Sequence, residues 1–194
     1  MDTKQIKVAS TQYPVIDLIK NRFSPRAFSD KAITLDDVNA LLEAAMWAPS
    51  AMNEQPWRYF VALKNNEVAF QKMVDLLMPG NTPWAKNAGA LILCAAKLTH
   101  DQNQQPNVSA LHDVGMSNQN LLLQALSMNI YGHVMGGFDK QRSKQVLNIS
   151  DDYQPICIIA LGYLGDAETL SVGFKERESA SRTRKSLSEV ITYL

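Results

Sequence analysis

The sequence has no long apolar run and no excess of charge of either sign. Its apolar stretches fall short of the roughly 20 residues that a membrane-spanning helix needs, and the N-terminus lacks an apolar signal core. Lys plus Arg and Asp plus Glu both total 19, which argues against a nucleic-acid partner and against an acidic disordered tail. With 46% apolar and 20% charged residues, the composition is typical of a globular protein, which we expect to be cytoplasmic.

Cysteine and histidine are also scarce. The two cysteines, Cys94 and Cys157, lie inside apolar runs. This favours two buried thiols in a reducing compartment over the alternatives of a disulfide or a reactive thiol. The three histidines, His100, His112 and His133, lie far apart in the sequence without metal-ligand spacing. We therefore predict no metal site.

Familiar catalytic motifs are absent as well. The chain has no G-x-S-x-G elbow, no H-E-x-x-H, no C-x-x-C and no phosphate-binding G-x-x-x-x-G-K loop. The glycines between residues 132 and 137 do not follow the dinucleotide fingerprint. A side-chain nucleophile or a Rossmann site is therefore not supported.

Apolar periodicity and turn residues divide the chain into helices and strands. Thr34 caps an amphipathic helix, and residues 88–96 form a continuous apolar run typical of a strand buried on both faces. No repeat or linker interrupts the chain, so residues 1–194 are predicted to form one α+β or α/β domain, with 1–12 as a loose arm. The predicted helices cover 14–22, 34–46, 67–77, 110–128, 140–147 and a short terminal helix from Ser186, and the strands cover 58–64, 88–96, 130–135 and 153–164.

Two basic segments are candidates for binding an anion. In the first, Arg22, Ser24 and Arg26 follow a helix at a point where Pro25 blocks further helix. The second, at 182–185, precedes a helix start, where free N–H groups also favour phosphate. Arginine suits phosphate or carboxylate because its donors form a rigid fork. Taken alone, each segment is better explained as a solvated helix end or charge run, and only the rest of the chain favours anion binding.

Two further segments offer polar groups on a tight backbone. The loop Pro49–Gln55 carries Ser50, Asn53 and Gln55, and the Gly136-Gly137 pair follows a strand, where its amides can approach a ligand. The alternatives are a self-satisfied turn and a plain strand-to-helix turn.

In order along the chain, these segments resemble the nitroreductase family of FMN-dependent oxidoreductases. Five motifs carry the resemblance, which covers essentially all 194 residues. They are R-x-S-x-R at 22–26, A-P-S-x-x-N-x-Q-P-W at 48–57, D-x-G-x-x-x-Q-N-L-L-L-x-A at 113–125, G-G-F-D at 136–139 and R-x-R-K-x-L at 182–187.

The resemblance implies an α+β three-layer sandwich, with a mainly antiparallel central sheet flanked by helices, and an intertwined homodimer with two flavins at its interface. It assigns no catalytic side chain, because the flavin N5 does the chemistry. It implies that FMN is held by Arg22, Phe23, Ser24, Arg26, Pro49, Ser50, Met52, Asn53, Met135, Gly136, Gly137, Arg182 and Arg184, with the residues 49–53 reaching the partner's flavin.

The implied reaction is ping-pong hydride transfer from NAD(P)H to nitroaromatics, quinones or similar small-molecule acceptors. The alternatives are a dedicated reductase of a small aldehyde or unsaturated acid, and a flavin-binding carrier or sensor with little turnover. Phe23 departs from the family's usual arginine or histidine, and the segment 99–107 is shorter than the pocket-roofing insertion of larger members. Asn81 and Lys86 fall where many relatives place an amide and a lysine near the flavin.

Overall fold

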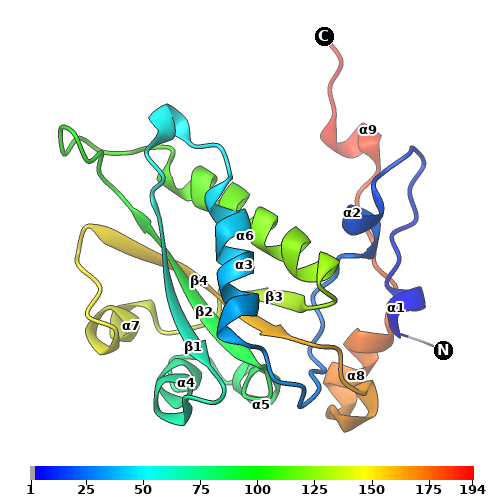
Figure 1. The fold of residues 1–194 in the computed structure, drawn as a ribbon. Helices are drawn as coiled ribbons and strands as arrows, with labels where there is room; N and C mark the ends of the chain where they lie inside the picture. Colours follow the sequence, from blue (N-terminus) through cyan, green and yellow to red (C-terminus); the bar gives the residue numbers. More distant parts are fainter. Residues whose placement is uncertain (1–2) are drawn as a thin grey trace.

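The computed structural model describes residues 3–194 and contains one four-stranded sheet with helices on both faces (Figure 1). The strand order is β1-β2-β4-β3, and every neighbouring pair is antiparallel. This confirms the predicted α+β class and the antiparallel sheet. The strands are β1 (Trp57–Leu63), β2 (Ala90–Lys97), β3 (Tyr131–Met135) and β4 (Tyr153–Gly162).

The central strand β2 is buried on both faces, as its apolar run predicts. All residues from Ala90 to Ala96 in β2 are fully buried, and Ile92 lies opposite Ile159 of β4. One core cluster fills the space between the sheet and the helices α3 (Leu35–Met46) and α6 (Ala110–Ser127), and a second lies on the opposite face under α4 (Glu67–Val74). The sheet is therefore the middle layer of three.

Local signals place several helix ends correctly. The Thr34 side chain accepts a hydrogen bond from the Asp37 N–H, and the Asp37 carboxylate accepts one from the Thr34 N–H. This capping box satisfies two backbone donors at the start of α3, as the sequence predicts. The terminal helix α9 (Leu187–Val190) begins at Ser186, whose N–H and hydroxyl both donate to the Glu189 carboxylate, while α7 (Lys140–Val146) is capped by the side chain of Asp139.

Other boundaries differ from the prediction. The first predicted helix, α2 (Asp17–Asn21), starts three residues after Pro14 and leaves the side chain of Ile16 exposed. The helix α4 ends at Val74 rather than at residue 77. The short helices α5 (Thr82–Ala85) and α8 (Val172–Ser179) were not predicted, and neither were the 3-10 turns at Ala51–Asn53 and Ala167–Thr169.

The N-terminal arm is tied down rather than loose over its described part. The helix α1 (Thr3–Ile6) is followed by Lys7, whose ammonium group is buried and donates to the carbonyl oxygens of Arg177 and Ala180 at the end of α8. A cation at a helix C-terminus is favourable because it meets unpaired carbonyls. Met1 and Asp2 lie outside the described residues. No helix within 3–194 is both long and apolar enough to cross a membrane.

Candidate functional site

The first basic segment leaves α2 in an extended conformation. Arg22 caps the helix with φ −67° and ψ 121°, and its guanidinium donates to the Ser24 hydroxyl at 3.2 Å. Because Pro25 disfavours a helical conformation at Ser24, the chain cannot continue the helix here. The segment therefore presents Arg22, Ser24 and Arg26 from a loop.

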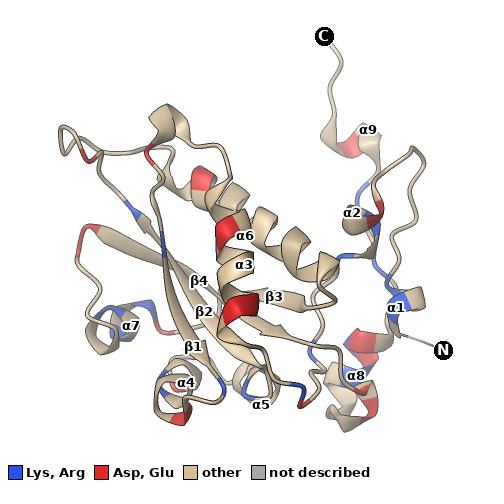
Figure 2. Ribbon diagram, in the orientation of Figure 1, with Lys and Arg blue, Asp and Glu red and all other residues tan. Residues whose placement is uncertain are grey.

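The second basic segment lies beside the first, although about 160 residues separate them in the sequence. The Arg182 guanidinium donates to the carbonyl oxygens of Lys7 at 3.0 Å and of Lys20 at 2.7 Å. This arginine therefore joins three distant stretches of backbone. In Figure 2, Lys and Arg residues gather where α1, α2 and the segment after α8 come together.

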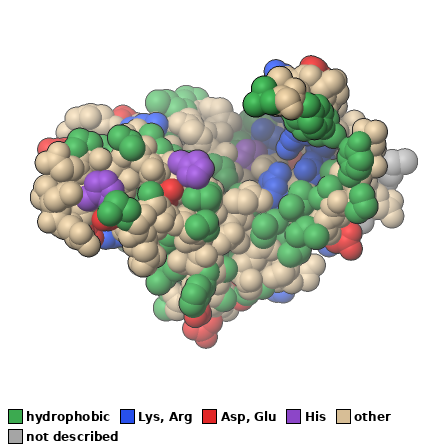
Figure 3. Space-filling model, turned by 90° about the horizontal axis from the view of Figure 1, so that it is seen from above, with side chains coloured by type: hydrophobic (Ala, Val, Ile, Leu, Met, Phe, Trp, Pro, Cys, Tyr) green, Lys and Arg blue, Asp and Glu red, His purple; other side chains and the backbone are tan. Residues whose placement is uncertain are grey.

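Two cavities open on this cluster. A small one of about 190 Å³ and a large one of about 880 Å³ share the side chains of Arg22, Ser24, Arg182 and Arg184. Figure 3 shows a hollow on this side of the molecule with Lys and Arg side chains inside it. The small cavity adds Lys7, Phe23, Arg26 and Arg177, and the large one adds Tyr13, Val15, Gln119, Leu122 and Val134 among others.

The arginines of the cluster form no salt bridge with a carboxylate among the described residues. Over residues 3–194, this holds for Arg22, Arg26, Arg177, Arg182 and Arg184. Burial lowers the pKa of the Arg22 guanidinium, and the nearby charges of Arg182 and Arg184 lower it further. Burial likewise lowers the pKa of Arg182. Partly desolvated cations that repel one another favour the binding of an anion.

The buried carboxylate of Glu178 in α8 fixes the first basic loop by hydrogen bonds to its backbone. Only 1% of Glu178 is exposed, and both of its oxygens accept the N–H of Arg26, at 3.1 and 3.2 Å. Its charge also raises the pKa of Arg26, against the larger lowering caused by burial. Sequence reasoning missed Glu178 and Arg177 because α8 has a polar sequence without apolar periodicity. It also missed Lys7, which lies in the segment that was predicted to be a loose arm.

A neutral histidine supports the same loop from the sheet. The Nδ1 of His133 in β3 lies 2.9 Å from the carbonyl oxygen of Pro25. A carbonyl only accepts, so Nδ1 carries the proton and donates. The ring packs on Trp84 with 4.5 Å between ring centroids. Burial lowers the pKa of His133 to about 4, and the neighbouring Arg26 and Arg22 add to the lowering. Sequence reasoning missed this contact, because a single histidine carries no pattern that would indicate it.

The glycine turn after β3 is tightly packed. The side-chain amide of Asn81 donates to the Gly137 carbonyl at 3.0 Å, and a Cβ at position 137 would lie only 2.9 Å from that amide. Within residues 3–194 the N–H of Gly137 donates no hydrogen bond, so it remains available. The space beside Gly136 is open. The side chain of Met135 points into the core and is 2% exposed, so only its backbone can contribute here.

The side chain of Phe23, like that of Met135, is buried in the core. It is 4% exposed and packs on Tyr131, with 5.2 Å between ring centroids, while still bordering the small cavity. Phe23 therefore anchors the basic loop to the core by packing, and a polar side chain at this position would not make that contact.

The loop that carries Pro49, Ser50, Met52 and Asn53 does not border either arginine cavity of its own chain. It packs on the start of α6, where the buried carboxylate of Asp113 accepts the Ala51 N–H at 3.0 Å. Met52 and Asn53 have φ of 54° and 56°, a left-handed conformation that costs free energy for residues other than glycine. The Met52 side chain is 81% exposed. The loop is thus a rigid, exposed projection.

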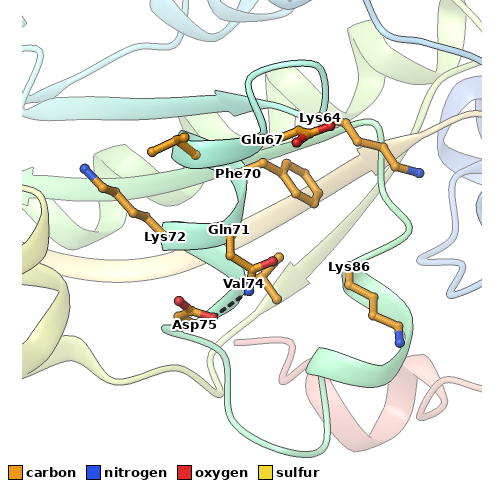
Figure 4. A pocket seen from close by; sticks show the side chains of 9 residues that line it. Lys64, Glu67, Phe70, Gln71, Lys72, Val74, Asp75 and Lys86 are labelled. Atoms are coloured by element: carbon orange, nitrogen blue, oxygen red, sulfur yellow. Dashed lines mark hydrogen bonds between the residues drawn. The ribbon is translucent and has the colours of Figure 1, made fainter.

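A separate hollow of about 650 Å³ lies beside α4, away from the arginine cluster (Figure 4). Lys72 extends to the opposite side from Lys64 and Lys86, so the three cations do not converge on one ligand. Lys86 therefore borders this hollow rather than the arginine cavities. Asn81, by contrast, lies against the glycine turn.

Comparison with known proteins decides the family. Residues 19–163 match the sequence profile of the Nitroreductase family. The chain belongs to the nitroreductase family. This membership accounts for the three-layer fold, the R-x-S-x-R loop and the glycine turn, all of which lie within the matched range. Arg182 and Arg184 lie beyond that range, yet the fold brings them to the same site.

Three individual proteins are similar to this chain over at least three quarters of its length. A crystal structure described as an oxidoreductase containing FMN is 35% identical, has a TM-score of 0.89, and covers 94% of this chain and 93% of its own. A protein of Archaeoglobus fulgidus, provisionally named NADH dehydrogenase/NAD(P)H nitroreductase, is 29% identical over 78% of this chain and 86% of its own. The FMN reductase (NADPH) of Bacillus subtilis strain 168 is 24% identical over 76% of this chain and 65% of its own.

Proposed function

We propose that the protein is an FMN-dependent oxidoreductase that uses NAD(P)H to reduce quinones, nitroaromatics or similar small acceptors. The observation that carries the proposal is the cluster of arginines, none of them in a salt bridge among the described residues, that lines a cavity of about 880 Å³. A cavity of this size matches a cofactor-sized ligand, and the cluster matches a phosphate at one end of it. Relatives named for FMN and for NAD(P)H support the same assignment.

The described residues fit FMN in chemistry as well as in size. Arg22, Arg182 and Arg184 would hold the phosphate, since none of them has a carboxylate partner within residues 3–194. Val134 and Leu122 supply apolar wall to the large cavity, and the free N–H of Gly137 is a donor suited to a flavin nitrogen. When bound, FMN supplies hydride transfer in two half-reactions, from NAD(P)H and then to the acceptor.

The chain's own residues then bind and orient rather than react. The arginines fix the phosphate end, Glu178 and His133 hold the loop that carries Arg26, and the glycine turn leaves its N–H free. Positive charge around a reduced, anionic ligand stabilises it. No acid or base from the chain is required for hydride transfer, which agrees with the absence of a catalytic motif.

A second copy of the chain would complete the site. The loop at 49–53 does not border the arginine cavities of its own chain, and its Met52 is exposed by 81%, while Trp47 just before it and Leu111 of α6 are exposed by 82% and 48%. Exposed large apolar side chains that are adjacent in the fold favour an interface. We infer a homodimer in which Pro49, Ser50, Met52 and Asn53 reach the cofactor of the partner subunit.

The visible spectrum of the purified protein, recorded before and after anaerobic NADH and NADPH, tests the proposal. Flavin bands that bleach with a nicotinamide and return with a quinone are expected. Arg22→Gln and Arg184→Gln should each weaken FMN binding about tenfold or more without changing riboflavin binding, because riboflavin lacks the phosphate. Arg142→Gln, on the exposed side of α7, is the matched control and should change neither affinity. A colourless protein that does not bind added FMN would refute the assignment.

A further inference from the structure

The two cysteines, which the sequence places 63 residues apart, face each other across the centre of the sheet. Cys94 of β2 and Cys157 of β4 are direct partners in the antiparallel register. Both side chains belong to the core cluster between the sheet and the helices α3 and α6. Cys94 is fully buried, and Cys157 is 4% exposed. Both thiols are free.

Their position suits a covalent link. Directly opposed residues of an antiparallel pair have Cα atoms about 4.5–5.5 Å apart. A disulfide requires about 4.4–6.8 Å, so the backbone need not separate or approach for the bond to form. The register shifts immediately beside the pair: Ala95 lies opposite Pro155, which leaves Ile156 as the extra residue of a bulge. A bulge makes the strand locally more twisted, which gives the two Cβ atoms room to adjust.

A polar network in this apolar core distinguishes the two sulfurs. The Asn118 amide of α6 donates to the Cys157 Sγ at 3.5 Å. The Tyr59 hydroxyl lies 2.8 Å from the Ser117 hydroxyl, which itself donates to the Ala45 carbonyl, and 3.2 Å from the Asn118 carbonyl oxygen, so its one proton is shared between these two acceptors. Burial raises the pKa of Tyr59, so this hydroxyl keeps its proton and remains a donor. No side chain within residues 3–194 donates a hydrogen bond to the Cys94 Sγ, and its S–H instead donates to the Ile92 carbonyl at 3.8 Å.

The two thiols therefore differ in their tendency to ionise. The neighbouring Cys94 thiol and the hydrogen bond from Asn118 lower the pKa of the Cys157 thiol. Burial raises the pKa of the Cys94 thiol well above its usual value. Because the thiolate is the reactive form, Cys157 is the member of the pair that should react first.

We propose that Cys94 and Cys157 form a redox pair that a small peroxide converts into an intramolecular disulfide linking β2 to β4. The Cys157 thiolate attacks one peroxide oxygen, the O–O bond breaks, and a sulfenic acid and hydroxide form. The Cys94 sulfur then attacks the sulfenic sulfur, forming the S–S bond and releasing water. Overall, two thiols lose two electrons and two protons, and hydrogen peroxide is reduced to two waters. The proposal does not depend on the cofactor assignment.

The first test uses the wild-type protein, reduced and then exposed to hydrogen peroxide in its folded state. After quenching, the protein is unfolded in denaturant, alkylated and weighed. The alkylatable thiols are expected to fall from two to none, with a mass about 2 Da below the reduced form and full reversal by dithiothreitol. A peptide digest should contain the Cys94–Cys157 link. Two thiols that stay alkylatable, a gain of oxygen without a link, or a link between two chains would each overturn the proposal.

The order of attack is tested with serine variants and a trap for sulfenic acid. In Cys94→Ser, Cys157 should be labelled by dimedone, and in Cys157→Ser the remaining Cys94 should be labelled several-fold more slowly. Adding Asn118→Ala to Cys94→Ser should slow the labelling of Cys157. Asn120→Ala is the matched control, because Asn120 donates to the Ala44 carbonyl and does not touch the sulfur. Equal labelling of the two thiols would contradict the order of attack.

Discussion

The buried histidine beneath the basic loop makes a quantitative prediction about acid. His133 donates to Pro25, packs on Trp84 and is held neutral, with its pKa lowered to about 4 from the ordinary 6.5. The unfolded chain takes up this proton near the ordinary value, and the folded chain resists it until the pH is much lower. The stability associated with neutral His133 is therefore complete above about pH 6.5 and is lost progressively as the pH falls to about 4.

The size of the effect follows from the two pKa values. A difference of about 2.5 units, at about 1.36 kcal/mol per unit, corresponds to about 3 kcal/mol in the free energy of unfolding. Other titrating groups contribute to the total pH dependence, so the useful quantity is a difference between variants. His133→Asn keeps a neutral N–H that can donate to Pro25 and removes the titrating ring.

Urea unfolding followed by tryptophan fluorescence measures this difference at a series of pH values. At about pH 7.5 the wild type should be the more stable, because the variant loses the ring contact with Trp84. Between about pH 7.5 and 4.5 the wild type should lose about 2–3 kcal/mol more than His133→Asn does. Parallel curves, within about 0.5 kcal/mol over the whole range, would show that His133 is not held neutral and would refute the reasoning.

Three further predictions concern stability and are checked by urea unfolding. Glu178→Gln should destabilise the fold by about 1–3 kcal/mol, since a buried charged acceptor of the Arg26 N–H is lost; an unchanged midpoint would show that this contact is dispensable. Gly137→Ala should cost about 1–3 kcal/mol because its Cβ meets the Asn81 amide, and Asn81→Ser should recover part of that cost when combined with it. Thr34→Ala should cost about 1 kcal/mol through the lost capping box, whereas Thr34→Ser should cost much less.

The parts of the fold that the sequence predicted have strong local signals. The capping box at Thr34, the continuous apolar run of β2 and the long amphipathic helix α6 are each visible in a short window. The helix α8 was missed because its sequence carries no apolar stripe. Its position depends on Lys7, which caps its end from the other terminus of the chain. A contact between residues that distant leaves no periodic signal.

The residues of the candidate site likewise include some that the sequence predicted and some that it did not. The arginines of both basic segments were identified from residue type and family resemblance, and the fold places them around shared cavities. The groups that hold the loop in place, Glu178 and His133, were missed because each is a single residue whose role depends on burial. The pairing of Cys94 with Cys157 was also invisible, because register between two strands cannot be read from either strand alone.

The hydrogen bonds of Arg182 to the carbonyls of Lys7 and Lys20, here called the Arg182 clamp, affect the order in which parts of the protein form during synthesis. The sheet is complete once β4 reaches Gly162, but the clamp needs the carbonyls of Lys7 and Lys20 together with a residue synthesised twenty positions later. The core can thus begin to fold on the ribosome before the arginine cluster is complete. Only a chain translated past Arg184 contains the full cluster, so the cluster forms later than the sheet.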